Sequence, residues 1–233
     1  FKLPVAAPVS FLKEDRSGRN VAHSNYGIRL SQLTNGWDVS AFYYHSLDAT
    51  PTFHRISQPW EPLLFQARHG EIDQAGGTVT KDLGSAVLKG EFVYTHGRRF
   101  NVTRPTAADG LVRQDTIDYA LGLDFTLPSD IRLNLQFFQR AELNYELDIF
   151  QDRLENGGSI FLQGDLWRDF QGQILLIHSF NRNEWMLRPR LTWNFARNWK
   201  LAAGADIFNG PPTGLFGRFD SSDRVYTELR FSF

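Results

Sequence analysis

Arginines gather at alternate positions near the carboxyl end of the chain, and acidic residues accompany them. Alternate positions of an extended strand share one face, so neighbouring strands would bring these charges together. Guanidinium groups bind carboxylates through paired hydrogen bonds, and they bind Asp and Glu of an adjacent strand in the same way. The group predicts either an anion-attracting, carboxylate-binding wall or paired charges that make a sheet rigid. Its members are Arg188, Arg190, Arg224, Arg230, Asp206 and Glu228.

The other reactive residue types show no spacing typical of a catalytic or metal site. Six His residues are scattered without HxxxH or HExxH spacing, and Cys is absent, which removes thiolate ligands and thiol nucleophiles. No GxSxG, GxxxxGK[ST] or GxGxxG motif is present,. A Ser/His pair assembled from distant strands stays open, but we expect no enzyme, no cofactor and no bound metal.

Apolar and polar residues alternate along most of the chain, which is the period of strands with one apolar face. In the last ten residues, 224–233, Val225, Leu229 and Phe231 fall on one side, while charged residues fall on the other. Such a face could meet a second sheet in a soluble sandwich, or lipid in a membrane barrel. An amphipathic strand that ends on Phe resembles the closing strand and assembly signal of bacterial outer-membrane barrels.

The pattern predicts an all-β, antiparallel, up-and-down transmembrane β-barrel with about 11–12 strands over residues 23–233, and an alternative is that these strands are part of a larger barrel. An odd count would conflict with the even number usual for bacterial single-chain barrels. Residues 1–22 predict an irregular segment or extracellular loop. Short turns on one rim and long loops on the other are typical of such barrels. Tight turns are expected at 33–36, 81–85, 128–130, 170–173 and 197–199, and long loops at 48–66, 97–113, 144–158 and 209–223.

Composition agrees with a barrel and excludes several other classes. The formal charge of -1 does not favour nucleic acid as a partner,. No apolar run reaches the ~18 residues that a membrane helix requires,. The mean hydropathy of -0.35 suits a barrel, because only alternate residues would face lipid.

If the apolar side chains face lipid, the charged ones line a wet interior, because unpaired ions cannot be buried dry. Trp and Tyr on the apolar face predict interfacial girdles. The girdle residues are Trp37, Trp185, Trp193, Trp199, Tyr26, Tyr43, Tyr94 and Tyr119, and inward-facing aromatics are expected at Tyr44, Phe138, Trp167, Phe208 and Tyr226. Besides the six residues of the carboxy-terminal cluster, the expected pore lining comprises Lys89, Glu91, Asp118, Asp124, Arg132, Arg140 and Glu142.

Several segments resemble an uncharacterised family of large proteobacterial outer-membrane proteins with porin-like barrels. These segments are SNYGIRLS (24–31), LKGEFVYT (88–95), DYALGLDFTLPSDIRLNLQFFQR (118–140) and residues 199–233. The resemblance implies a bacterial outer-membrane location, and it implies that the chain corresponds to the carboxy-terminal portion of a longer protein. It carries no catalytic motif and implies no solute.

The sequence therefore favours a porin-like channel for passive diffusion of small hydrophilic solutes through a charged lumen. An alternative is a non-conducting outer-membrane barrel that scaffolds or anchors partners in an envelope complex. A soluble lipocalin-like binder is a third reading. Expected partners are outer-membrane lipid and lipopolysaccharide, small hydrophilic solutes, possible envelope proteins, and the barrel assembly machinery through the carboxy-terminal strand.

Overall fold

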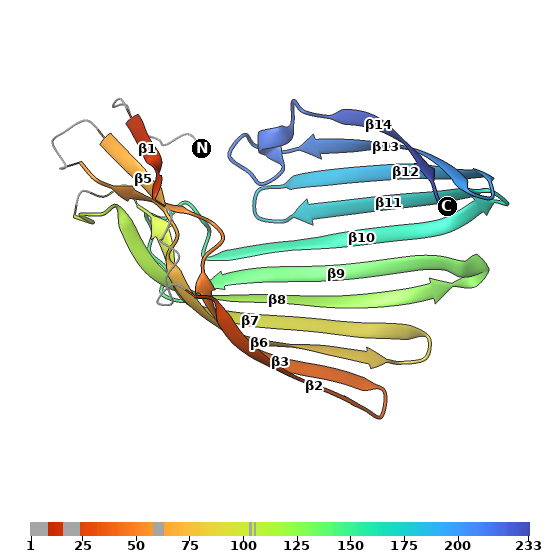
Figure 1. Ribbon diagram of the computed structural model, residues 1–233, viewed down its shortest axis with the longest axis horizontal. Coiled ribbons are helices and arrows are strands. Elements are labelled where there is room, and N and C mark those ends of the chain that lie inside the picture. Colours follow the sequence, from red (N-terminus) through yellow and green to blue (C-terminus); the bar gives the residue numbers. More distant parts are fainter. Residues whose placement is uncertain (1–8, 16–23, 58–62, 103, 105) are drawn as a thin grey trace.

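The computed structural model describes residues 9–15, 24–57, 63–102, 104 and 106–233, which form two β-sheets (Figure 1). The large sheet has 11 strands and the small one has three. The described residues contain only short 3-10 turns besides strands, among them η2 (Pro128–Asp130) and η3 (Gly217–Phe219). Within these residues, no helix has the length and apolar character needed to cross a membrane.

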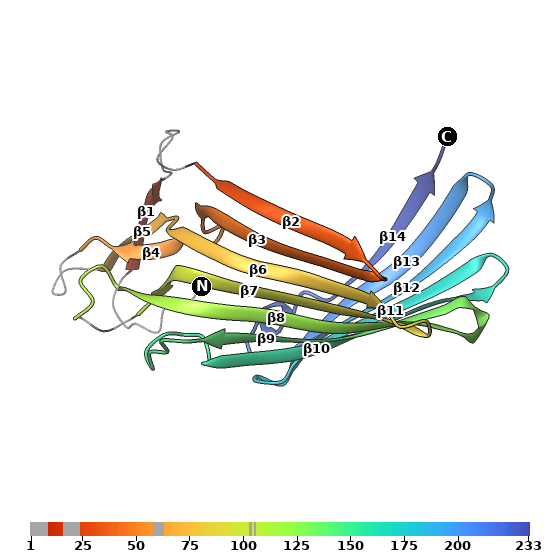
Figure 2. The same cartoon turned by 90° about the horizontal axis from the view of Figure 1, so that it is seen from below.

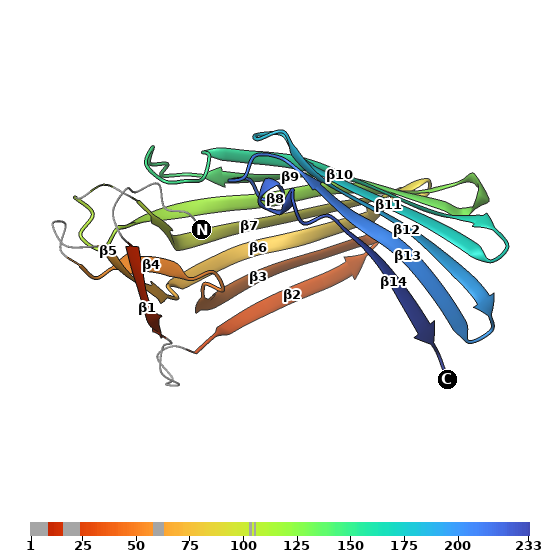
Figure 3. The same cartoon turned by 90° about the horizontal axis from the view of Figure 1, so that it is seen from above.

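The large sheet is a meander in which each strand pairs antiparallel with the next member along the chain. Its strands are β2 (Tyr26–Thr34), β3 (Trp37–Leu47), β6 (Glu71–Asp82), β7 (Ala86–Asn101), β8 (Leu111–Leu127), β9 (Ile131–Glu142), β10 (Leu154–Trp167), β11 (Phe170–Ser179), β12 (Glu184–Ala196), β13 (Trp199–Asn209) and β14 (Arg224–Phe231). The predicted all-β, antiparallel meander is confirmed. The sheet bends into a trough (Figures 2 and 3), and no pairing among the described residues joins β2 to β14, so no closed barrel is seen.

The connections differ in length at the two ends of the trough. The end that carries the carboxyl terminus has only tight turns, at 35–36, 83–85, 128–130, 168–169 and 197–198 (Figure 1). At the first of these, Asn35 and Gly36 have φ of 49° and 73°, as a type I′ hairpin turn requires. The opposite end carries the connections 48–70, 102–110, 143–153 and 210–223, with 180–183 as a short exception. We call the two ends the tight-turn rim and the long-loop rim.

The long-loop rim is more ordered than the sequence predicts. The loop expected at 97–113 shrinks to 102–110, because β7 and β8 continue past a bulge between Thr95 and Arg98. The loop expected at 144–158 ends at 153, where β10 begins. At the other rim, the turn expected at 170–173 lies at 168–169, since Gln171 and Gly172 are paired within β11.

A small sheet of three strands also lies at the long-loop rim (Figure 1). Strand β1 (Val9–Asp15) falls within the segment predicted to be irregular, whose residues 1–8 and 16–22 lie outside the described part. Strands β4 (Thr52–Arg55) and β5 (Leu63–Arg68) fall within or beside the predicted loop 48–66, of which 58–62 lie outside the described part. The prolines predict that this stretch does not form a central strand. In the structure, its strands belong to the separate small sheet.

The two faces of the large sheet differ in polarity and in burial. One face carries apolar side chains that stand in the open, such as Leu121, 52% exposed, and Val225, 83% exposed. The other face carries the fully buried polar side chains of the sheet, including Thr95, Thr116 and Asp206. Side chains crowd together on the concave side of a bent sheet, so the polar face is the inner one. The sheet is the reverse of a soluble sandwich, whose apolar faces meet in a core.

Candidate functional site

The strand register places all thirteen predicted pore-lining residues on the inner, polar face. Cross-strand partners define rows across this face, and one row runs from Glu91 through Ala120, Phe138, Gly157 and Ser179 to Glu184. Along one strand, residues that are an even number of positions apart share a face. Each of the other predicted lining residues has this spacing from a residue of such a row on its own strand, and therefore lies on the inner face. The sequence pattern therefore assigned the face of each residue, but not the partner of each charge.

The carboxy-terminal arginines hold two carboxylates between three strands. Arg188 of β12 donates from Nε to Oδ1 of Asp206 on β13, and Arg224 of β14 donates from Nε to Oδ2 over 2.6 Å. Glu228 of β14 is bound in the same way, with Arg190 Nη2 at 3.0 Å from Oε2 and Arg230 Nη2 at 2.8 Å from Oε1. All four carboxylate oxygens are engaged. The cluster keeps a formal charge of +2, from four Arg less Asp206 and Glu228.

A depression of about 520 Å³ opens beside these arginines on the inner face. Tyr226 of β14 also lines the depression. Its ring lies over Gly204, so closely that a Cβ atom at position 204 would be 2.6 Å from the tyrosine oxygen. Phe161 of β10 and Leu175 of β11 are directly paired across the strands and form its apolar side. The lining comprises Phe161, Gln173, Leu175, Arg188, Arg190, Asp206, Arg224 and Tyr226.

A second group of charges lies in the middle strands of the same face. Lys89 pairs with Asp124 at 2.5 Å, and Arg140 donates from Nε to Asp118 over 2.6 Å. Within the described residues, no ion pair involves Arg132 or Glu91, although both lie on this face. Within the described part of the chain, the structure therefore brings ten of the thirteen predicted lining residues into two ion-pair groups and leaves three charges, Arg132, Glu91 and Glu142, apart from them.

A buried polar patch on the inner face was not found from the sequence. Glu142, 2% exposed, faces Thr116 across the strands, and Thr116 faces Thr95. Both carboxylate oxygens of Glu142, the Thr116 hydroxyl and the Gln114 amide find no partner within the described side chains. Glu142 was predicted as a pore-lining residue, but its burial separates it from the open part of the trough.

The outer, apolar face carries a continuous band of aromatic rings along the tight-turn rim. Neighbouring ring centroids lie 4.7–6.5 Å apart from Trp167 to Phe231. Trp167 belongs to this band because a bulge between Asp165 and Trp167 turns it outward, so its predicted inward orientation is wrong. The chain of contacts runs through Trp167, Phe170, Trp193, Phe195, Trp199 and Phe231.

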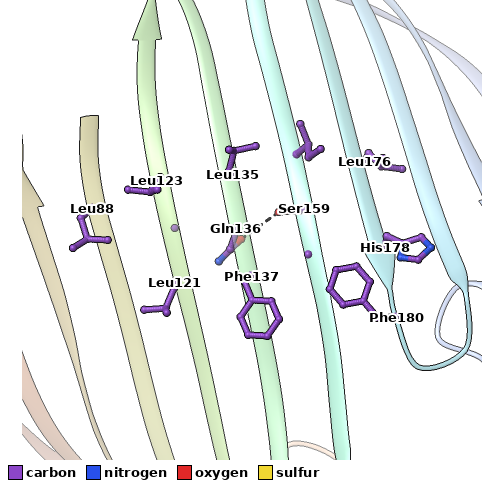
Figure 4. Close-up of a pocket in the computed structure, with 13 residues that line it drawn as sticks. Leu88, Leu121, Leu123, Leu135, Gln136, Phe137, Ser159, Leu176, His178 and Phe180 are labelled. Carbon is purple, nitrogen blue, oxygen red and sulfur yellow. Dashed lines mark hydrogen bonds between the residues drawn. The ribbon is translucent and has the colours of Figure 1, made fainter. Parts of the chain in front are cut away.

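Leucine and other aliphatic side chains fill the middle of the apolar face. Figure 4 shows Leu88, Leu121, Leu123, Leu135 and Leu176 side by side, around a shallow groove of about 570 Å³. The polar residues that border this groove are His178, Gln136 and Ser159. The side chains of Gln136 and Ser159 lie on the inner face, where they are hydrogen-bonded to each other. The groove has no charged group that could orient a polar solute.

Towards the long-loop rim, the apolar face ends in hydrogen-bonded tyrosines. The Tyr43 hydroxyl donates to Asp73 over 2.6 Å, and the Tyr94 hydroxyl donates to Asp115 over 2.9 Å. His45 also contacts Asp73, with Nδ1 at 2.9 Å from Oδ1. Tyrosines with an apolar ring and a hydrogen-bonded polar tip are typical of a membrane–water boundary.

The connections of the long-loop rim are fixed by buried and paired charges. Glu184, 1% exposed, accepts hydrogen bonds from the backbone N–H of Phe216 at 2.7 Å and of Gly217 at 3.3 Å, which holds the connection 210–223. Arg104 bonds Glu146 and, over 2.9 Å, Asp148, which joins the connections 102–110 and 143–153. The Arg104 guanidinium lowers the pKa of Glu146.

The small sheet is attached to the rim through β4 and β1. Asn101, at the end of β7, accepts from the Phe53 N–H at 3.1 Å and donates to the Phe53 carbonyl. His69 bonds the Asp48 carbonyl through Nδ1 at 2.7 Å and Glu14 of β1 through Nε2 at 3.0 Å. These two acceptors, chiefly the Asp48 carbonyl, raise the pKa of His69 against the opposing effect of burial.

The sequence matches no protein-family model and no curated protein. The geometry on which a function can be proposed comprises an apolar outer face bounded by aromatic residues and a charged inner face with a cationic depression.

Proposed function

We propose that the chain is part of a bacterial outer-membrane β-barrel that conducts small hydrophilic solutes by passive diffusion. Lipid would cover the apolar face, and water would fill the trough along the polar face. The carboxy-terminal strand β14 would be the element that the barrel assembly machinery reads. The family resemblance of the sequence supports the same location.

The observation that carries the proposal is the inverted polarity of the sheet. Large apolar side chains on many strands of one face stand exposed, while the buried hydrophobic residues of the described part are few. Monomeric soluble proteins rarely expose apolar patches larger than a few hundred Å². An apolar belt around an interior with charges of both signs is the arrangement of outer-membrane channels.

Outward-facing aromatic residues near the two rims are separated by a distance that suits a bilayer. On β12, Trp185 and Phe195 face outward near opposite rims. Ten residue steps cover about 33 Å along a strand, and a strand tilt of ~40° reduces this to about 25 Å, the height of the apolar belt in outer-membrane barrels. The tight-turn rim would then face the periplasm and the long-loop rim the exterior.

Strand direction restricts how the barrel can close. β2 and β14 run the same way, because an even number of antiparallel steps separates the first and last of 11 strands. If a second copy were inserted in the same orientation, its β2 would lie parallel to β14 of the first copy. Barrels of this class pair their strands antiparallel. We therefore infer that an odd number of additional antiparallel strands joins β2 to β14.

Closure has its own test, because an unpaired edge in hydrocarbon leaves backbone groups that cost several kcal/mol each. In membranes, the amides of β2 and β14 should be protected from hydrogen exchange as strongly as those of β8. Fast exchange confined to the two edge strands would contradict closure.

Single-channel recording in planar bilayers tests the proposed activity. The membrane-extracted protein should give stepwise currents in KCl, because the inner face is charged and hydrated. Folded protein that inserts without any current would instead favour the non-conducting barrel that anchors envelope partners. Extraction into buffer without detergent would remove both readings and support a soluble protein.

A further inference from the structure

We propose that the depression beside the carboxy-terminal arginines binds amphipathic carboxylates, with benzoate as the simplest probe. The site consists of Arg188 and Arg190 for the carboxylate, and Phe161, Leu175 and Tyr226 for the apolar body. This inference rests on the proposed function, since it assumes that the trough is a solute path, and it names the class of solute that the path would retain.

The arginines keep donors for a ligand after binding their own acidic partners. A guanidinium has five N–H donors, whereas Arg188 uses Nε on Asp206 and Arg190 uses Nη2 on Glu228. The oxygens of both carboxylates are already taken by Arg residues. A further carboxylate would therefore meet free donors and a net charge of +2 without displacing either acidic side chain.

The apolar side lies directly beside these donors. Phe161 pairs with Leu175 across the strands, and Leu175 pairs with Arg188 on the next strand. Directly paired residues on one face of a sheet have Cβ atoms ~5 Å apart. An aromatic ring on Phe161 and Leu175 would thus place its carboxylate at the guanidinium groups.

The size of the depression also fits an aryl carboxylate. Its volume is about 520 Å³, and a cavity of about 150 Å³ already accommodates benzene. The remaining space suits a carboxylate with its hydration water. Small inorganic anions would gain nothing from Phe161 and Leu175, and neutral aromatic solutes would gain nothing from the arginines.

Equilibrium dialysis of the detergent-solubilised protein against labelled benzoate tests binding without any need for conduction. Acetate supplies the charge without the ring, and benzyl alcohol supplies the ring without the charge. We expect saturable benzoate binding, with acetate and benzyl alcohol each at least about 5-fold weaker competitors, because each lacks one set of contacts. Acetate competing as well as benzoate would overturn the proposal.

Two variants and two matched controls locate the site. Arg190→Gln, which leaves Glu228 bound to Arg230, and Phe161→Ala should each weaken benzoate binding about 5- to 10-fold. Arg132→Gln and Phe138→Ala change the same residue types on the same face outside the depression and should leave it nearly unchanged. Equal losses in variants and controls would contradict this location.

The two proposals fail in different ways. Stepwise current without benzoate binding would retain the channel and remove the site. Saturable binding by folded protein that passes no current would retain the site and remove the channel.

Discussion

Arg224 on the last strand donates from Nε to Oδ2 of Asp206 on the preceding strand over 2.6 Å, and Asp206 is only 1% exposed. Arg188 occupies the other oxygen of the same carboxylate. Asp206 therefore binds two arginines but offsets only one of their two positive charges, and the side chains of Arg188 and Arg224 are 42% and 67% exposed. Its charge controls how positive this wall is.

Replacing Asp206 with Asn should make the proposed channel more selective for anions. Asn keeps the size of the side chain but removes one negative charge, and a unit charge a few Å away is worth about 1 kcal/mol in water. We expect the permeability ratio of chloride to potassium to rise roughly 2- to 5-fold, measured as the reversal potential in a KCl gradient. Glu91→Gln is the matched control, because it removes the same charge from the same face away from the cluster, and an equal shift in both would show that the position is unimportant.

Leu135 and Gln136 are neighbours on β9 that point to opposite faces. An arginine on the lipid side near the bilayer midplane costs about 2–4 kcal/mol, whereas lumen positions accept charge. Leu135→Arg should therefore lower the free energy of unfolding by about 2–4 kcal/mol, and Gln136→Arg should change it far less. Urea titration of protein folded into vesicles measures both, and equal losses would mean that the faces are wrongly assigned.

Alternation was enough to predict the antiparallel meander, because most strands are apolar on one face only. It failed at β11, where Ile174 and Leu176 face outward while Leu175 and Ile177 face the trough. With apolar residues on both faces, the period disappears. The position of Leu175 and its partner Phe161 beside the arginines could therefore not be predicted from the alternation.

Bulges account for other differences between the prediction and the structure. A bulge inserts one residue and inverts the facing of everything beyond it. One lies between Thr95 and Arg98, where the loop predicted at 97–113 instead contains the ends of two strands. Another turns Trp167 outward. The partner of each charge also depends on register, so the sharing of Asp206 by two arginines could not be derived from spacing alone.

Glu184 is expected to hold the connection 210–223 in place. Replacing Glu184 with Ala removes the acceptor for the Phe216 and Gly217 N–H groups, and leaving such groups unsatisfied costs about 1–3 kcal/mol. Trypsin should then cut after the exposed Arg218 several-fold faster than in the unchanged protein. Glu184→Gln retains an oxygen acceptor and should show a smaller increase, and no difference between Glu184→Ala and the unchanged protein would contradict the role.

His69 is expected to make attachment of β1 depend on pH. The hydrogen bonds to the Asp48 carbonyl and to Glu14 raise its pKa above the ordinary value of about 6.5,. A group whose pKa is raised on folding contributes its full stability below the unfolded pKa and loses it as pH rises through the folded pKa. Of these two bonds only the one to Glu14 reaches β1, and through it β1 should be held most tightly below about pH 6.5 and loosen as pH rises above it,.

Hydrogen exchange of the β1 amides between about pH 5 and 8, corrected for the intrinsic rate, measures this effect. His69→Gln should remove most of the pH dependence, because Gln does not titrate. His54 on β4, whose pKa is lowered by burial and then by Arg68 and Arg99, is present in both proteins, so the difference between them isolates His69. Protection of β1 that changes with pH equally in both proteins would assign the dependence to another group.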